Sequence, residues 1–231
     1  MTDNSKQIEK QKVRTASDTP APALSGWPGG GVGRRSEAPT DVGAHHKDPS
    51  PESLLREFVS DCFADPLGFV LYAFPWDSGA FDMVELPEPW ASRYGRKYGP
   101  DKWACEFLDR IGEEVRQRGF DGAHAVAPLQ MAVTSGHGIG KSTVTAWLIL
   151  WIASTRPNSR GVVTANTVSQ LQTKTWAELA KWLKRCRTGH WFQITTSAGS
   201  MSLRHVRHKE SWRCDALTAR RDEAEGFAGL H

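Results

Sequence analysis

The residues best suited to chemistry lie between Met131 and Thr143, where a short apolar segment runs into a glycine-rich turn and Gly140-Lys141-Ser142. Glycines let successive backbone N–H groups face phosphate oxygens, and a helix beginning here adds its positive end. In such a loop Lys141 neutralises the β- and γ-phosphates, and Ser142 offers its hydroxyl to Mg²⁺. The pattern predicts an ATP and Mg²⁺ site with Lys141 as its catalytic residue, formed by Ser135, Gly136, His137, Gly138, Ile139, Gly140, Lys141, Ser142 and Thr143.

The loop is a variant, because Ser135 stands where the usual pattern has glycine. Its surroundings strengthen the prediction. Leu129 to Thr134 has the character of a short buried strand, and Ser142 to Ala153 that of a helix, so strand, loop and helix follow in the required order. The alternative is an ordinary glycine-rich turn that carries a solvated lysine.

Composition narrows the class of protein. The chain has 231 residues, 39% hydrophobic and 24% charged, enough for one sizeable core. Its N-terminus is polar and no apolar stretch approaches the roughly 20 residues of a membrane span, so we expect neither a secretory signal nor a membrane partner. The four cysteines are scattered without a C-x-x-C pair, which predicts reduced structural thiols rather than a disulfide framework or a zinc site.

Basic residues concentrate between Lys181 and Arg213, where Glu210 is the single acid. Such a stretch is typical of a nucleic-acid contact. A solvated helix end followed by an exposed hairpin explains it almost as well. The candidate nucleic-acid residues are Lys181, Lys184, Arg185, Arg187, Arg204 and Arg207.

Three regions follow from the pattern along the chain. Residues 1–50 are rich in Ser, Pro, Gly and mixed charge, which predicts a disordered tail. Residues 51–127 form a helical accessory region. Ser53 caps a first helix, Pro66 to Tyr72 begins a second apolar segment, and Lys102 to Arg118 makes an amphipathic helix. Residues 128–231 form the core that holds the phosphate loop.

Within the core, strands and helices alternate. Gly161 to Ala165 predicts a buried strand, Asn166-Thr167 a helix cap, and Val168 to Arg187 a helix. This alternation favours an α/β fold with a mostly parallel sheet covered by helices on both faces. Further short strands are expected at Trp191 to Ile194, Ser200 to Val206 and Trp212 to Ala219.

Several segments together resemble the ATPase half of the large terminase subunit of tailed bacteriophages, the motor that packs DNA into procapsids. The resemblance covers about residues 54 to 231. It is carried by Asp65–Trp76, Gly99–Trp103 with the helix through Ile111-Gly112, Ser135–Thr143, Val163–Thr167 with Gln170, and Glu225–His231. A serine at the position of Ser135 is also familiar among terminase phosphate loops.

The resemblance implies a P-loop NTPase fold of the RecA-like (ASCE) type, here a partial parallel sheet with flanking helices. It also implies viral double-stranded DNA, the terminase small subunit and the portal as partners, and the cytoplasm of a bacterial host as the location. Two positions depart from the family. Ala104 follows Trp103 where relatives often have glutamine, and His137 stands where some packaging motors have arginine.

A working motor of this kind needs a second acidic motif, an apolar strand followed by Asp-Glu. Asp222-Glu223 does not meet this requirement, because Arg220 and Arg221 precede it. The expectation is therefore a fragment that stops before this Walker B strand and binds ATP with little or no hydrolysis. The alternatives are a non-catalytic DNA- or partner-binding module with a vestigial loop and, less favoured, a small-molecule kinase or a helicase.

Overall fold

The computed structural model describes residues 50–79, 84–134, 136 and 138–218. Residues 1–49 of the predicted tail, Ser135, His137 and the Asp222-Glu223 pair lie outside the described residues. All described residues belong to one compact unit that begins at Lys47. The proposed division at residue 127 remains a prediction.

The first two helices begin at proline residues preceded by polar caps. α1 (Pro51–Asp61) is capped by Ser50, whose hydroxyl accepts a 3.1 Å hydrogen bond from the backbone N–H of Ser53. The predicted cap at Ser53 is therefore wrong by three residues, since Ser53 lies in the first turn. After a 3-10 turn, η1 (Cys62–Ala64), α2 (Pro66–Ala73) is capped in the same way by Asp65.

The accessory region continues through η2 (Trp76–Ser78) and the short α3 (Trp90–Tyr94) into α4 (Lys102–Gln117), a helix that the sequence predicts correctly. α4 buries Leu108, Ile111 and Val115 along one face. Glycine is needed at position 112, because a Cβ atom there would lie 2.9 Å from the carbonyl oxygen of Ala64. Gly112 therefore lets α4 pack closely against η1.

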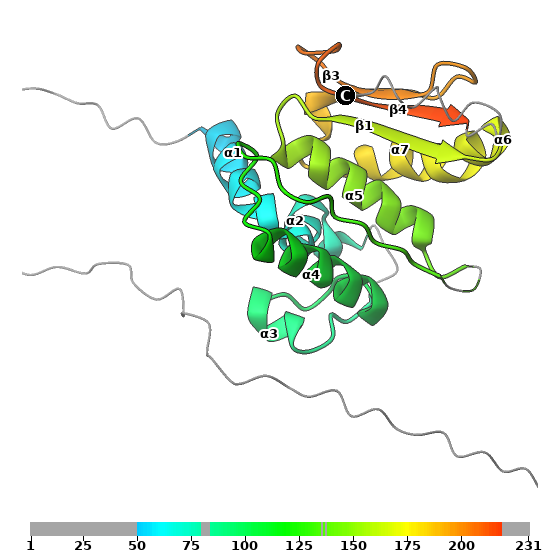
Figure 1. Ribbon diagram of the computed structural model, residues 1–231. Coiled ribbons are helices and arrows are strands. Elements are labelled where there is room, and N and C mark those ends of the chain that lie inside the picture. Colours follow the sequence, from blue (N-terminus) through cyan, green and yellow to red (C-terminus); the bar gives the residue numbers. More distant parts are fainter. Residues whose placement is uncertain (1–49, 80–83, 135, 137, 219–231) are drawn as a thin grey trace, which may run out of the picture. The chain divides into compact units, whose positions relative to one another are not determined.

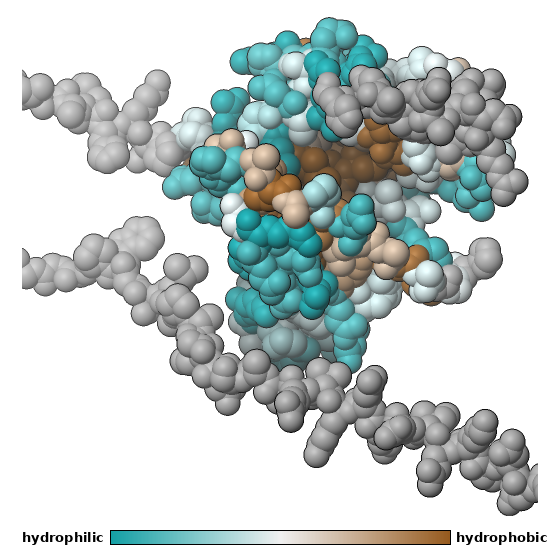
Figure 2. Space-filling model, in the orientation of Figure 1, coloured by the Kyte–Doolittle hydropathy of each residue, from teal (hydrophilic) through white to brown (hydrophobic). Residues whose placement is uncertain are grey.

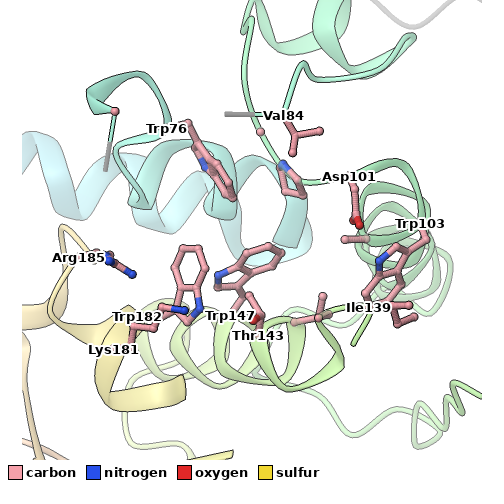
Figure 3. A pocket seen from close by; sticks show the side chains of 16 residues that line it. Trp76, Val84, Asp101, Trp103, Ile139, Thr143, Trp147, Lys181, Trp182 and Arg185 are labelled. Carbon is pink, nitrogen blue, oxygen red and sulfur yellow. The ribbon is translucent and has the colours of Figure 1, made fainter. Parts of the chain in front are cut away.

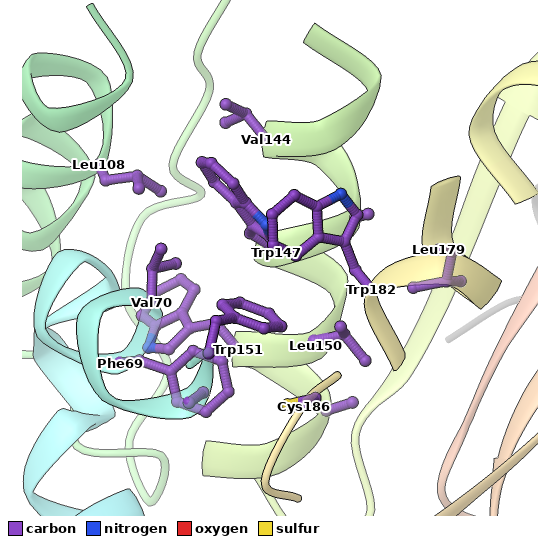
Figure 4. Close-up of a cluster of buried hydrophobic side chains, with 14 of the residues drawn as sticks. Phe69, Val70, Leu108, Val144, Trp147, Leu150, Trp151, Leu179, Trp182 and Cys186 are labelled. Carbon is purple, nitrogen blue, oxygen red and sulfur yellow. The ribbon is translucent and has the colours of Figure 1, made fainter. Parts of the chain in front are cut away.

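α5 (Lys141–Thr155) is the central helix of the unit. Its side chains Trp147, Leu150 and Trp151 meet side chains of α2, α4 and α7 in the core (Figure 4). The indole N–H of Trp151 also donates to the carbonyl of Cys62, which ties α5 to η1. Among the described residues, no helix combines the length and the hydrophobicity that a membrane crossing requires.

A long helical run follows the strand β1 (Arg160–Ala165). The predicted cap is confirmed, because the Thr167 hydroxyl accepts the N–H of Gln170 at 3.1 Å. The run consists of α6 (Val168–Gln170), a π-helical segment η3 (Leu171–Trp176) and α7 (Ala177–Leu183), so it ends before the predicted Arg187. A 3-10 turn, η4 (Gly189–Trp191), leads into the second strand.

The sheet is mixed rather than mostly parallel. Its strands are β1, β2 (Phe192–Thr195), β3 (Ser202–His205) and β4 (Arg213–Thr218), in the order β1-β4-β3-β2 (Figure 1). Only the β1–β4 pair is parallel among the described strands; β2–β3 and β3–β4 are antiparallel. Tight connections explain this difference, since short links join neighbouring strands only in antiparallel fashion.

The helices α5 and α7 cover one face of this sheet (Figure 1). Exposure alternates along β1, where Val163 packs on the core and Val162 stays 36% exposed. Leu217 on β4 is 39% exposed. Within the described part of the chain, the prediction of helices on both faces is therefore wrong.

The segment Leu129 to Thr134 does not form the predicted strand. A strand needs a neighbour to receive its backbone hydrogen bonds, and β1 is an edge strand that pairs with β4 alone among the described strands. Met131 and Val133 are consequently 39% exposed each, whereas Leu129 still packs on the core. Figure 2 shows a hydrophobic area at the centre of this face of the molecule. Because no strand forms before it, the described part of the phosphate loop is positioned mainly by α5.

Candidate functional site

The glycine turn leads directly into α5. Gly138 and Gly140 have φ angles of +82° and +83°, in the left-handed region that other residues rarely occupy. Gly140 is the N-cap residue that precedes α5, and its carbonyl accepts the N–H of Val144 at 3.0 Å. No side chain of the described residues caps this helix start. Its first N–H groups therefore suit an anionic ligand.

Lys141 is the first residue of α5, and its side chain folds back over the turn. The ammonium group donates to the carbonyl oxygen of Gly136. Its positive charge therefore lies beside the glycine turn, where the sequence predicts phosphate. Ser142 follows on the first turn of the helix and is half-buried.

The end of the loop is joined to α7 through a carboxylate that sequence reasoning missed. Glu178 accepts hydrogen bonds from the Thr143 hydroxyl at 3.1 Å and from the Trp182 indole N–H at 3.0 Å. The Lys181 ammonium lies 3.3 Å from the same carboxylate. The spacing of Glu178, Lys181 and Trp182 on one helix hints at their contact, but nothing in the sequence connects them to Thr143.

A cavity of about 500 Å³ opens beside the loop (Figure 3). Ile139, Gly140 and Thr143 form the loop side of this cavity. The other walls carry four indole rings, a carboxylate and two cationic side chains, namely Trp76, Trp103, Trp147, Trp182, Asp101, Lys181 and Arg185. The site thus combines a phosphate-binding turn, an aromatic wall and additional positive charge.

Two indole donors of this aromatic wall have no acceptor. The Nε1 atoms of Trp103 and Trp147 are buried and make no hydrogen bond. A buried donor without a partner is costly, of the order of 1–3 kcal/mol.

The six predicted nucleic-acid residues do not form one surface. Lys181 and Arg185 line the cavity beside the phosphate loop. Lys184 is exposed, and the Arg187 guanidinium lies 4.6 Å from the ring centre of Tyr72.

The remaining two candidates belong to the β3–β4 hairpin. Arg204 pairs with Glu210 at 3.4 Å, whereas Arg207 lies exposed on the turn. The basic stretch therefore divides between the cavity and the hairpin. Charge density along the sequence could not reveal this division, because it depends on where the helix and the hairpin are packed.

The cysteines are structural, as predicted. All four are buried free thiols. Burial raises the pKa of Cys186 to about 11 and that of Cys214 to about 12, which keeps both protonated at neutral pH. Among the described residues, no group of three or more His, Cys, Asp or Glu side chains is placed to hold a metal ion.

Comparison of the chain with protein families, with curated proteins and with solved structures found no match in any of the three. The candidate site therefore stands on its own residues and geometry.

Proposed function

We propose that this chain binds ATP with Mg²⁺ at the phosphate loop, as the nucleotide-binding part of a viral DNA-packaging motor of the terminase type. The observation that carries nucleotide binding is the cavity of about 500 Å³ whose wall includes Gly140 and Thr143. A cavity of this size is in the range of small-molecule sites. Its position beside the loop supports the proposal, because a base and a sugar would need room next to the predicted phosphate position.

The loop residues have the chemistry that a triphosphate requires. The Lys141 ammonium would exchange the Gly136 carbonyl for phosphate oxygens, and the uncapped start of α5 would add N–H donors. Ser142 would contribute its hydroxyl to Mg²⁺, which usually keeps several waters and uses substrate phosphates as ligands. The bound ion would neutralise phosphate charge.

The remaining walls suit the rest of the nucleotide. Of the four indoles in the wall, Trp103 is half-buried and offers the most ring surface to a purine. Lys181 and Arg185 add positive charge on the α7 side. We assign these two residues to the nucleotide rather than to DNA.

The role in DNA packaging rests on the terminase-like segments of the sequence. In this proposal the motor acts on double-stranded viral DNA together with a small subunit and a portal, in the cytoplasm of the bacterial host. The proposal includes a P-loop NTPase fold of the RecA-like type around the phosphate loop.

Tryptophan fluorescence tests nucleotide binding directly, because four indoles line the cavity. Titration with Mg-ATP should change the emission, and Lys141→Ala should weaken the apparent affinity by about tenfold or more. Lys174→Ala is the matched control, since Lys174 is an exposed lysine on η3. An unchanged affinity of Lys141→Ala for Mg-ATP would refute the proposal.

A second candidate function is a DNA- or partner-binding module in which the loop is vestigial. The exposed Arg207 on the β3–β4 turn favours it. Salt-dependent duplex binding that survives Lys141→Ala, with no detectable nucleotide binding, would support this module over the motor. Steady ATP turnover that Lys141→Ala abolishes would instead establish a hydrolase.

A further inference from the structure

A second cavity, of about 660 Å³, lies at the opposite end of α5 from the phosphate loop. Its walls include Ser154 and Thr155 at the C-terminal end of α5, Arg56 of α1 and the turn between β3 and β4. A 15-residue helix is about 22 Å long, so the two cavities are separate sites. The proposed nucleotide site does not use any of these residues.

Three rings form a nearly parallel stack on the hairpin. The ring centres of His205 and Trp212 lie 4.1 Å apart with an angle of 2° between their planes. His208 stacks on His205 at 5.2 Å and 24°. His208 is the exposed member of this stack, so it presents an aromatic surface to solvent.

The turn itself holds the rings in place. Nδ1 of His205 accepts the backbone N–H groups of Arg207 and His208, at 3.2 and 3.3 Å. The indole N–H of Trp212 donates to the carbonyl of Ala153 at 2.9 Å, which fixes the base of the stack to α5. The aromatic surface is therefore preorganised rather than assembled by a ligand.

Cationic groups surround this surface. Arg56 and Arg207 line the cavity, and 65% of the Arg56 side chain is exposed. Glu52 is the acidic residue of the lining, and its oxygens already accept hydrogen bonds from Arg56, from His190 and from the Trp191 indole. The same positive charges act on His205. Burial is the largest cause that lowers the pKa of His205, and the charges of His208, Arg207 and Arg56 lower it further.

We propose that this cavity binds an unpaired nucleotide of a single nucleic-acid strand, with the base stacked on His208 and the adjacent phosphate held by Arg56 and Arg207. Aromatic platforms flanked by cations are how proteins hold single strands, because every base has a π-face. A paired base keeps both faces inside the duplex stack, so a double helix does not fit this arrangement. This proposal is independent of nucleotide binding at the phosphate loop.

Fluorescence anisotropy with a labelled 12-nucleotide oligo-dT and the full chain tests the proposal at low salt. His208→Ala should raise the Kd by about tenfold, the scale of one lost stacking contact. His208→Phe keeps an aromatic ring and should retain most of the affinity. Lys174→Ala is the control that should leave oligo-dT binding unchanged.

The two arginines are tested separately from the stack. Arg56→Gln combined with Arg207→Gln should weaken binding and reduce the slope of log K against log salt by about 1.4, the value for two phosphate contacts on a single strand. Both residues have exposed side chains, so this variant should melt at the temperature of the original chain. It remains informative even if His208→Ala lowers the melting temperature.

Four results would overturn the proposal. They are absence of oligo-dT binding at low salt, an unchanged Kd in both His208→Ala and the double arginine variant, equal affinity for a 12-base-pair duplex, and equal affinity for free dTMP. The last result would indicate a site for a mononucleotide rather than for a strand.

Discussion

Replacing Glu178 by alanine should destabilise the junction between the phosphate loop and α7. The substitution removes the acceptor for the Thr143 hydroxyl and for the Trp182 indole N–H, which lie 3.1 and 3.0 Å from the carboxylate. Trp182 is 5% exposed, so its donor loses its partner in a largely dry environment. Thr143 would also lose the contact that holds the end of the loop.

The magnitude follows from these contacts. Hydrogen bonds to a charged group contribute about 1.5–3 kcal/mol each. We use the lower value because 28% of the Glu178 side chain is exposed, which gives about 3 kcal/mol for two bonds. The solvated pair with Lys181 adds only about 0.3 kcal/mol. At about 2–4 °C per kcal/mol for a chain of this size, the melting temperature should fall by about 6–12 °C.

Urea unfolding followed by circular dichroism measures this change. Glu178→Gln keeps an amide oxygen as acceptor and should lose about half as much stability, since hydrogen bonds to neutral groups are about half as strong. Glu106→Ala is the control, because Glu106 makes only an exposed ion pair with Lys102 at 3.8 Å. An unfolding free energy of Glu178→Ala within about 0.5 kcal/mol of the original would refute the reasoning. Mg-ATP affinity should decrease along the same series.

Three further predictions concern other parts of the chain. Arg156 lies between aromatic rings, and its guanidinium is 4.1 Å from the ring centre of Trp151. Arg156→Met should therefore lower the free energy of unfolding, measured in urea, by about 1–2 kcal/mol. An unchanged free energy would show that this stacking does not stabilise the fold. Cys186 and Cys214 should react with a thiol reagent only after urea unfolding, and rapid labelling of the native chain would contradict their burial. The pKa of His205 in the folded chain lies below its ordinary 6.5, so the unfolded chain binds more protons near that pH. The free energy of unfolding should therefore fall as the pH decreases from 6.5 through the pKa of His205 in the folded chain. His205→Phe should reduce this dependence, and an identical pH profile for the variant would exclude His205 as its source.

Local sequence patterns predicted the helices well. α4 buries one periodic face, and Thr167 caps the helix after β1, as their residue types indicate. α5 and β1 also form close to their predicted bounds, but β1 is an edge strand whose residues are exposed or half-buried, so the prediction that it is buried is wrong. These elements are predictable because each depends on hydrogen bonds and side-chain spacing within about a dozen neighbouring residues.

The errors arise where an element needs a distant partner. Leu129 to Thr134 has a strand-like composition, but no neighbouring strand pairs with it among the described residues. The antiparallel pairing of β3 with β2 and with β4 was equally beyond local reasoning. Hydrophobic composition shows that a segment can be a strand, whereas pairing across the chain decides whether it is one.

The sequence by itself determined the glycine turn, Lys141 at the helix start and the presence of many basic residues after Lys181. Only the tertiary structure decided that Lys181 and Arg185 face the cavity beside that turn, and that Glu178 joins α7 to Thr143. The physical reason is one of range. A phosphate loop is built from consecutive backbone groups, while a cavity wall is built from side chains that packing brings together from distant parts of the chain.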